Sequence, residues 1–347
     1  MKRIEDYLRQ IEPVQKSVAD RVQKRLDSQT KPQGSLGRLE SFCIQLAQVQ
    51  GTDSPSYGKK IIFTLAADHG VVEEGVSAYP QSVTAQMVAN FLRGGAGVSV
   101  LAKHAGCDVV VVDIGVARSI DAKGYVDRKI DLGTKNFTKG PAMTREQAEI
   151  SIVTGIELAV NRDFDILGTG DMGIGNTTPS SAVAGVLTGI DPERITGRGT
   201  GIDEVTLGKK IDTIRRGIEI NNPDPADPID VLAKVGGFEI GGIAGLIIGA
   251  AVKRKLAVVD GFISTAGAMI ASSLNKDIAD YFLLSHLSAE KGHDLFAEYL
   301  GKKPVLDLGM RLGEGTGAAL AIELIDAAMC LYYEMATFEQ AGVDKKK

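Results

Sequence analysis

The feature that most constrains the fold is a series of short apolar runs separated by longer stretches with helical spacing. Six such runs occur, each ending in a glycine or a polar residue: Ile61–Ala67, Val109–Ile114, Phe164–Leu167, Leu256–Val259, Tyr281–Leu284 and Val305–Leu308. Continuously apolar strands between helices are typical of a parallel sheet that is covered on both faces. We therefore predict an α/β fold with a doubly wound, mostly parallel, six-stranded Rossmann-like sheet.

The two ends of the chain have a different character, because they carry helical spacing without strands. Apolar residues recur at intervals of three and four between Ile4 and Gln50, interrupted by the loop at 31–37, and an Ala-rich helix follows Gly315 to about Met335. At roughly 150 residues per domain, 347 residues allow a second, smaller unit. We predict a small helical domain from 1–55 with 320–347, and a large catalytic α/β domain over 56–319.

Composition and charge narrow the class of partner. The net charge is −5 and the dense basic runs are limited to Lys253–Lys255 and Lys345–Lys347, which argues against a nucleic-acid surface and favours a small ligand. Cys43, Cys107 and Cys330 are far apart and odd in number, as expected of reduced thiols in a cytoplasmic protein.

No membrane segment is expected. The N-terminus is charged and has no apolar core of a secretory signal. The longest apolar run, Ile240–Val252, has thirteen residues, short of the ~20 that a spanning helix needs. Its glycines at 241, 245 and 249 share one helix stripe, which predicts close helix packing.

Polar side chains follow the apolar runs where a parallel sheet would bring strand ends together. These residues are Asp68, His69, Asp113, Asp171, Asp260, His286 and Glu314. Ligands of open parallel sheets bind outside the carboxyl ends of the strands. We therefore expect this set of residues to line one crevice.

The densest glycine cluster, 168–180, directly follows a predicted strand and contains a GxGxxG pattern. Thr178 is a good N-cap and Pro179 suits a first helical turn, so backbone amides at this helix start would form an anion site. A dinucleotide site would also need a second strand ending in an acidic residue about 20 positions later, and a turn at 191–194 stands there instead. The cluster indicates a phosphate site, with a ligand-free tight turn as the alternative.

A second glycine-rich loop, 197–201, is followed by Lys209 and Lys210 on a helix that continues to Ile218. Its backbone amides could approach an anion and a lysine could add charge. A solvated helix face explains both lysines equally well.

Glu314 lies between glycines in the segment 311–317, again between a predicted strand and a helix. A carboxylate with little neighbouring side-chain bulk can approach a substrate closely and lose water, which raises its pKa toward that of a working base. A glutamate that stabilises the start of the next helix is the alternative.

Metal chemistry is not indicated by the spacing. Asp68 and His69 precede Glu73 and Glu74, but the four histidines are scattered and no HExxH pattern occurs. We predict no metal and no cofactor.

Seven segments, in order, resemble the nicotinate-nucleotide:dimethylbenzimidazole phosphoribosyltransferase family, and the resemblance covers nearly the whole chain. They are Lys31–Gly37, Ala67–Gly70, Pro80–Phe91, Gly173–Thr178, Lys234–Phe238, Ser285–Gly292 and Arg311–Gly315. The resemblance implies transfer of the 5-phosphoribosyl group from nicotinate mononucleotide to 5,6-dimethylbenzimidazole or a related base, with inversion at the anomeric carbon. The products would be α-ribazole 5′-phosphate and nicotinate, in the nucleotide loop assembly of cobalamin biosynthesis. It also implies a homodimer.

The resemblance assigns roles to particular residues. Glu314 would be the base and Asp171 a second carboxylate that stabilises positive charge on the sugar. The nucleotide and its phosphate would contact Gly173, Gly175, Asn176, Thr177, Gly199, Gly201, Lys210 and Ser288. The accepting base would contact Tyr79, Gln86, Met87 and Leu312.

Two features depart from the family pattern, one at Asp171 and one in the base-binding segment. Many relatives carry Glu at the position of Asp171, and members differ at Tyr79 and Met87, which predicts relaxed choice of the accepting base. Two rival functions are a nicotinamide-dependent dehydrogenase, from the GxGxxG pattern, and a nucleotide sensor without turnover. The missing strand-end acid disfavours the first, and a turnover assay separates the second.

Overall fold

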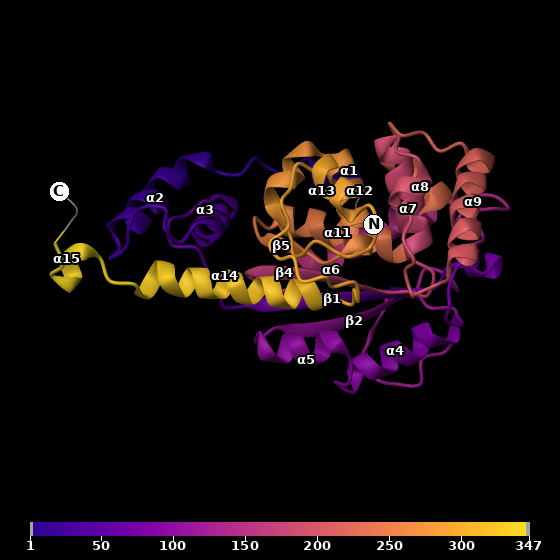
Figure 1. The fold of residues 1–347 in the computed structure, drawn as a ribbon, viewed down its shortest axis with the longest axis horizontal. Helices are drawn as coiled ribbons and strands as arrows, with labels where there is room; N and C mark the ends of the chain where they lie inside the picture. The colour runs from indigo at the N-terminus through magenta and orange to yellow at the C-terminus, as the bar shows by residue number, and fades with distance from the viewer. Residues whose placement is uncertain (1–2, 345–347) are drawn as a thin grey trace.

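A computed structural model describes residues 3–344, so the predicted basic run Lys345–Lys347 lies outside the described residues. Within that range six parallel strands form one sheet in the order β3-β2-β1-β4-β5-β6 (Figure 1). The strands are β1 (Lys60–Ala67), β2 (Asp108–Gly115), β3 (Val126–Asp127), β4 (Ile166–Met172), β5 (Leu256–Val259) and β6 (Phe282–Leu284). The predicted doubly wound α/β fold is confirmed.

Helices connect successive strands, as is usual for parallel strands, except that β2 and β3 are joined without a helix. The helices are α1 (Ile4–Leu8), α2 (Ala19–Ser28), α3 (Arg38–Gln50), α4 (Ser82–Leu92), α5 (Gly97–His104), α6 (Arg145–Val160), α7 (Thr177–Thr188), α8 (Pro192–Ile195), α9 (Glu204–Asn221), α10 (Pro228–Val235), α11 (Phe238–Val252), α12 (Phe262–Leu274), α13 (His293–Tyr299), α14 (Thr316–Glu334) and α15 (Phe338–Ala341). Short 3₁₀ turns are η1 (Lys16–Val18), η2 (Gly70–Glu74) and η3 (Lys276–Tyr281).

Of the six predicted strands, Val305–Leu308 is wrong, and Phe164–Leu167 was predicted to end too early. The run Val305–Leu308 forms only a single bridge, between Leu306 and His286, because Pro304 precedes it and Leu308 is exposed. The sixth strand is instead β3, which has two residues and no apolar run. β4 continues past Leu167 to Met172, so Asp171 lies inside a strand rather than in the loop after it.

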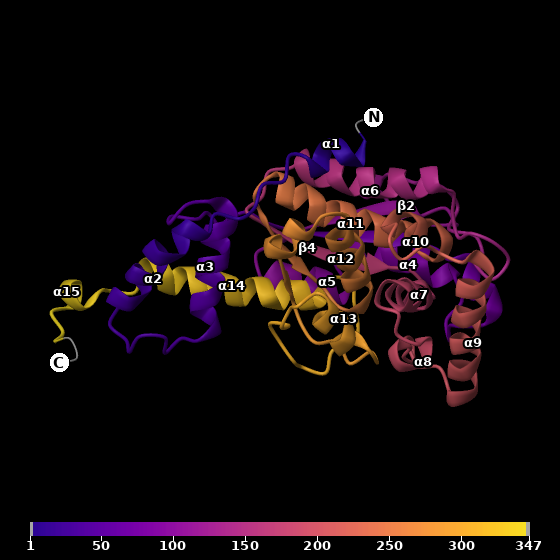
Figure 2. The same ribbon diagram turned by 90° about the horizontal axis from the view of Figure 1, so that it is seen from above.

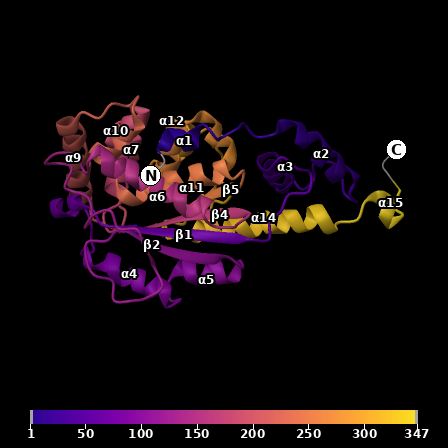
Figure 3. The same cartoon turned by 180° about the vertical axis from the view of Figure 1, so that it is seen from behind.

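Helices cover both faces of the sheet. Helices α4, α5 and the first part of α14 lie on one face, and α11, α12 and α6 form layers on the other (Figure 3). Helices α6 and α11 approach so closely that a Cβ at Gly245 would stand 1.9 Å from the Ile152 carbonyl oxygen. The predicted close packing of the glycine stripe is therefore confirmed.

A helical arm projects from one end of the α/β body (Figure 2). It consists of α2, α3 and the outer part of α14, so both chain ends contribute to it. Arg25 donates hydrogen bonds to the carbonyl oxygens of Tyr332 and Tyr333, and Gln29 donates to that of Leu331. α1 does not belong to the arm: it lies against α6 and α11 because Ile4 and Tyr7 are buried there, so the arm begins later than the predicted 1–55 segment.

Helix α14 is long and apolar enough to span a membrane by length and composition, and 56% of its apolar window is buried inside the protein. Its inner end packs on β4 and its outer end on α3, which accounts for its apolar surface.

Candidate active site

A cavity of about 450 Å³ opens at the carboxyl ends of β1, β4 and β5. Of the predicted row of polar strand-end residues, Asp171 and Glu314 line it. The others are buried and do not line the cavity: Asp68, His69, Asp113, Asp260 and His286 are each at most 1% exposed. The expectation of one crevice lined by the whole row is therefore only partly correct, since most of the row lies outside its lining.

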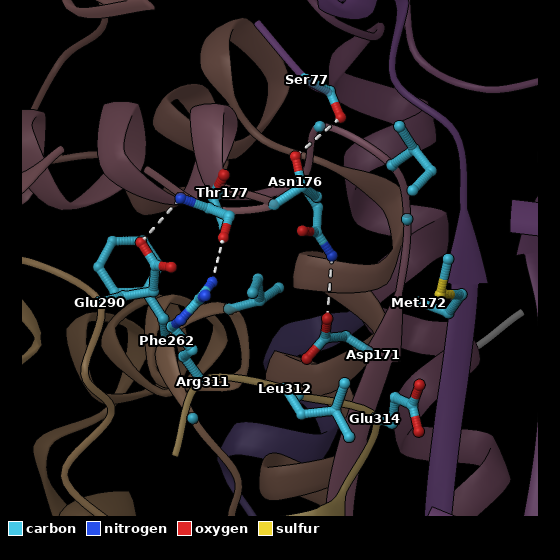
Figure 4. Close-up of a pocket in the computed structure, with 18 of the residues that line it drawn as sticks. Ser77, Asp171, Met172, Asn176, Thr177, Phe262, Glu290, Arg311, Leu312 and Glu314 are labelled. Carbon is cyan, nitrogen blue, oxygen red and sulfur yellow. Dashed lines mark hydrogen bonds between the residues drawn. The ribbon is translucent and has the colours of Figure 1, made fainter. Parts of the chain in front are cut away.

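Glu314 lies in the loop that precedes α14, and its carboxyl group is at the cavity wall (Figure 4). One carboxylate oxygen, Oε2, accepts a hydrogen bond from the backbone N–H of Val98 at 3.4 Å. Burial raises the pKa of Glu314, and the charge of Asp260 raises it further against that hydrogen bond. A carboxyl group in this state is suited to accept a proton near neutral pH.

Asp171 is the second carboxyl group at the cavity. Its Oδ2 accepts a hydrogen bond from Asn176 Nδ2 at 2.9 Å, and Asn176 stands at the start of α7 (Figure 4). Burial raises the pKa of Asp171 well above its usual range, and the charges of Asp260 and Glu239 add to the effect. These surroundings therefore favour the neutral acid over the carboxylate.

The part of the cavity next to Asn176 is built to receive an anion. Helix α7 begins there, with Asn176 rather than the predicted Thr178 as N-cap, so its positive end faces the cavity. Lys210 Nζ donates hydrogen bonds to Thr177 Oγ1 at 2.8 Å and to the Gly197 carbonyl at 3.0 Å. Burial lowers the pKa of Lys210 to about 8 although Glu290 opposes this. Lys210 thus lies one residue behind the cavity wall, and is not part of a solvated face.

Two side chains at this anion end had no role assigned from the sequence. Arg311 Nη1 donates to the Gly199 carbonyl at 2.9 Å, and Glu290 Oε2 accepts from the Gly199 N–H at 3.1 Å (Figure 4). Both residues lie in segments that carry the family resemblance. That resemblance is the sequence signal from which their place in the site could have been inferred. Together they fix the loop at Gly199 over Thr177.

The other end of the cavity is apolar and adjoins Glu314. Tyr79, Val83, Met87 and Leu312 line it, with Tyr79 54% and Leu312 59% exposed. Met172 and Phe262 also line the cavity, and no contact was predicted for either of them, although Met172 lies within the glycine cluster 168–180. The site therefore combines an anion end, an apolar end and two carboxyl groups in one cavity.

Three predicted contacts do not line the cavity: Lys210, which lies behind its wall, Gln86 and Gly201. Gln86 is exposed on α4, because Val83 and Met87 are four residues apart and face the cavity together, while Gln86 points elsewhere. Gly201 is exposed beside the loop rather than in the wall, and a Cβ placed on it would have no atom within 4 Å. The remaining predicted residues that line the cavity are Gly173, Gly175, Asn176, Thr177, Gly199 and Ser288.

Ser288 is held by a histidine behind it. Its backbone N–H donates to His293 Nδ1 at 2.8 Å, and His293 Nε2 lies 2.8 Å from Thr265 Oγ1. Because Nδ1 accepts, Nε2 carries the proton and the ring is neutral, in agreement with burial lowering the pKa of His293 to about 3. The Ser288 loop is therefore rigidly attached to α12 and α13.

His69 forms a buried ion pair rather than a metal site. Its Nε2 lies 2.9 Å from Glu239 Oε1, and neither side chain is exposed by more than 1%. Burial lowers the pKa of His69, but the charge of Glu239 outweighs burial and leaves the pKa raised. Among residues 3–344 no cluster of three or more His, Cys, Asp or Glu side chains is placed to hold a metal ion.

Comparisons with known proteins agree with this geometry. A family model described as a phosphoribosyltransferase matches residues 11–343. The nicotinate-nucleotide–dimethylbenzimidazole phosphoribosyltransferase of Geobacter metallireducens is 54% identical over 98% of both chains, and that of Geobacter sulfurreducens is 52% identical over 97% of both. The crystal structure of CobT from Thermus thermophilus superposes with a TM-score of 0.90 at 44% identity, covering 95% of this chain and 100% of that one.

Proposed function

Because the chain belongs to the nicotinate-nucleotide–dimethylbenzimidazole phosphoribosyltransferase family, we propose that its cavity transfers the 5-phosphoribosyl group of nicotinate mononucleotide to 5,6-dimethylbenzimidazole or a related base. The products are α-ribazole 5′-phosphate and nicotinate, which serve nucleotide loop assembly in cobalamin biosynthesis. One observation carries the proposal: the anion end at Thr177 and the apolar end at Met87 line one cavity together with Glu314 and Asp171. A phosphate and a flat heterocycle fit these two ends.

The nucleotide phosphate binds at the start of α7. Helix amides, Lys210 through Thr177, and Arg311 through the Gly199 loop supply positive charge there. The nicotinate ring lies toward Ser288, and the accepting base packs on Tyr79, Met87 and Leu312.

Glu314 accepts the ring N–H proton of the accepting base. The other ring nitrogen then donates its electron pair to the anomeric carbon, and the bond from that carbon to the pyridinium nitrogen breaks. The electron pair of the broken bond stays on the ring nitrogen and neutralises the departing nicotinate ring. Attack on the face opposite to the leaving group converts a β-nucleotide to an α-nucleotide.

Asp171 acts on the positive charge of the sugar. Without substrate, burial and neighbouring acids raise the pKa of Asp171. The positive charge of a bound pyridinium ribotide would favour the ionised carboxylate. The carboxylate then stabilises the oxocarbenium character of the anomeric carbon, as carboxylates do in glycoside cleavage.

A direct assay tests the function. The protein is incubated with nicotinate mononucleotide and dimethylbenzimidazole, and the products are separated by mass. We expect α-ribazole 5′-phosphate and free nicotinate in equal amounts. Tight nucleotide binding without either product would instead support a sensor.

Replacement of Glu314 by Gln tests the base. The amide matches the carboxyl group in shape but cannot accept the proton, so we expect turnover to fall about 100- to 10,000-fold with nucleotide binding retained. Turnover within about threefold of the wild type would exclude Glu314 as the base.

The reaction is proposed to need no metal or other cofactor. The leaving nitrogen is already cationic, so its departure requires neither an acid nor a Lewis acid. We expect full activity in excess EDTA. Loss of turnover on chelation, with recovery on adding Mg²⁺, would contradict this mechanism.

We also propose that the protein works as a homodimer in the cytoplasm, without inserting into membranes or binding nucleic acid. The projecting helical arm and the exposed apolar side chains of Leu308 and of the cavity residue Leu312 support association of two chains. Light scattering after size-exclusion chromatography should give twice the mass of the chain. A monomer of full activity would contradict the dimer.

A further inference from the structure

The backbone of Glu314 has a conformation that glutamate rarely adopts. Its φ is +66°, in the left-handed region where a side chain meets its own backbone. Such a conformation persists when surrounding structure holds it, and it is found most often where function requires it.

Two buried side chains grip the peptide that joins Glu314 to Gly315. Thr64, in the middle of β1, donates a hydrogen bond from Oγ1 to the Glu314 carbonyl oxygen at 2.8 Å. Asp260, at the end of β5, accepts the Gly315 N–H on Oδ2 at 2.9 Å. Both side chains are 0% exposed, so water does not compete for either bond.

β4 lies between β1, which carries Thr64, and β5, which Asp260 follows, and it packs directly against the Glu314 loop. Gly170 on β4 lies under the same peptide, and a Cβ there would stand 2.2 Å from the Glu314 carbonyl oxygen. β1, β4 and β5 are neighbours in the sheet, so the loop crosses three strands and is bound to the outer two.

Asp260 also fixes the helix that follows. Its Oδ1 accepts the N–H groups of Gly317 at 2.8 Å and Ala318 at 3.1 Å, in the first turn of α14. The Asp260 carboxyl group therefore fixes both the backbone beside Glu314 and the first turn of α14.

Thr64 stands out in its strand. β1 reads Lys-Ile-Ile-Phe-Thr-Leu-Ala-Ala, and its residues from Ile61 on are buried. A valine would fit this buried strand equally well in shape, so the hydroxyl group is explained by the bond it donates to Glu314 rather than by the sheet.

We propose that Thr64 and Asp260 are positioning residues for Glu314: they clamp the 314–315 peptide so that the carboxyl group is aimed at the reacting base. This inference rests on the proposed role of Glu314 as the base. Without the clamp the loop relaxes toward common backbone angles and the carboxyl group moves, and a displacement of about 1 Å can cost roughly 100-fold in rate.

Thr64→Val and Thr64→Ser test the clamp by steady-state kinetics. The valine variant keeps the shape and loses the donor, so we expect kcat to fall about 10- to 100-fold with KM for nicotinate mononucleotide unchanged. The serine variant keeps the donor and should recover kcat to within about threefold of the wild type. Thr188→Val is the matched control, because its hydroxyl also donates to a backbone carbonyl, that of Ala184 in α7, outside the cavity wall.

A double-mutant cycle separates positioning from a general effect on the fold. In a Glu314→Gln background the clamp has no base to position, so adding Thr64→Val should change kcat by less than about twofold. An equal loss in both backgrounds would overturn the proposal. So would a Thr64→Val variant with wild-type kcat beside an inactive Glu314→Gln variant.

Two further outcomes are informative. A nearly active Glu314→Gln variant would refute the proposed base, not the clamp geometry. If Thr64→Val fails to fold, Thr64→Ala and Thr64→Ser are compared instead, since both lack the methyl group and differ only in the donor. Equal kcat in that pair would overturn the clamp.

Discussion

Asp171 illustrates, at the scale of one residue, how function opposes stability at this site. Asp171 is 5% exposed and close to other acidic groups, and within residues 3–344 its carboxyl group accepts a side-chain hydrogen bond from the Asn176 amide alone. An acid whose pKa is higher in the folded chain than in the unfolded chain binds more protons when folded. Stability is therefore lost as pH rises above the unfolded value.

The Asp171→Asn variant should consequently be more stable than the wild type. The amide removes the ionisation that the folded site disfavours and can still accept the bond from Asn176. The gain in melting temperature should be small near pH 4 and should grow as pH rises through about 7. Thermal unfolding at several pH values measures it, and Asp165→Asn is the control.

Asp165 directly precedes β4, whereas Asp171 is near the end of that strand. The Asp165 carboxylate accepts a hydrogen bond from Lys255, and its pKa is lowered. Burial alone would raise that pKa, but bonds from Ser56, Lys255 and the Lys59 amide outweigh it, so its loss should destabilise the protein near neutral pH. A destabilised Asp171→Asn variant near pH 7 would contradict our account of the site.

Single residues were predictable from sequence where local pattern carried the signal. Glu314 was found because glycines flank it after a predicted strand end. Thr64 was not, since its hydroxyl partner is 250 positions away in the chain and its neighbours read as an ordinary buried strand. Gln86 was misplaced because membership in a resembling segment does not tell which helix face a side chain occupies.

At the scale of elements, the link between α9 and α7 predicts a pH dependence. Lys210 on α9 reaches Thr177 at the start of α7, and burial lowers its pKa to about 8. The ammonium group is charged below that pH and neutral above it. We expect kcat/KM for nicotinate mononucleotide, which reports the free enzyme, to fall as pH rises past about 8.

Lys210→Gln should have a lower kcat/KM at neutral pH and no such decline. Lys209→Gln is the matched control, because Lys209 is the preceding residue on α9 and is exposed. A decline that persists unchanged in Lys210→Gln would show that another group titrates.

Elements were predicted well where burial was continuous and poorly where it was not. The runs at β1, β2 and β5 are buried through most of their length, and their predicted bounds agree with the structure to within one residue. β3 was missed because its two residues, a half-buried Val126 and an exposed Asp127, leave no apolar run. The end of β4 was read as a loop because glycine is rare in strands, yet Gly170 is needed there to admit the Glu314 loop.

At the scale of the whole molecule, the buried apolar residues form one continuous core that extends from the α/β body into the arm. Leu46 on α3 is fully buried inside the arm, where α3 packs on α14. Leu246 on α11 is fully buried in the body, beside the sheet. The arm is small and is held by segments from the two chain ends, so its local unfolding free energy should lie below that of the body.

Leu46→Ala and Leu246→Ala therefore form a matched pair, because each removes the same buried atoms at a cost of about 2–5 kcal/mol. Under native conditions, amide hydrogen exchange in Leu46→Ala should accelerate in α2, α3 and the outer part of α14, and remain unchanged in α11. Leu246→Ala should accelerate exchange in α6 and α11, because these helices pack on each other. Since α14 runs from the Glu314 loop into the arm and packs on both β4 and α3, it is the element that connects the arm to the body. Equal acceleration in α11 from both variants would mean that the molecule unfolds as one cooperative unit and that α14 transmits strain along its whole length.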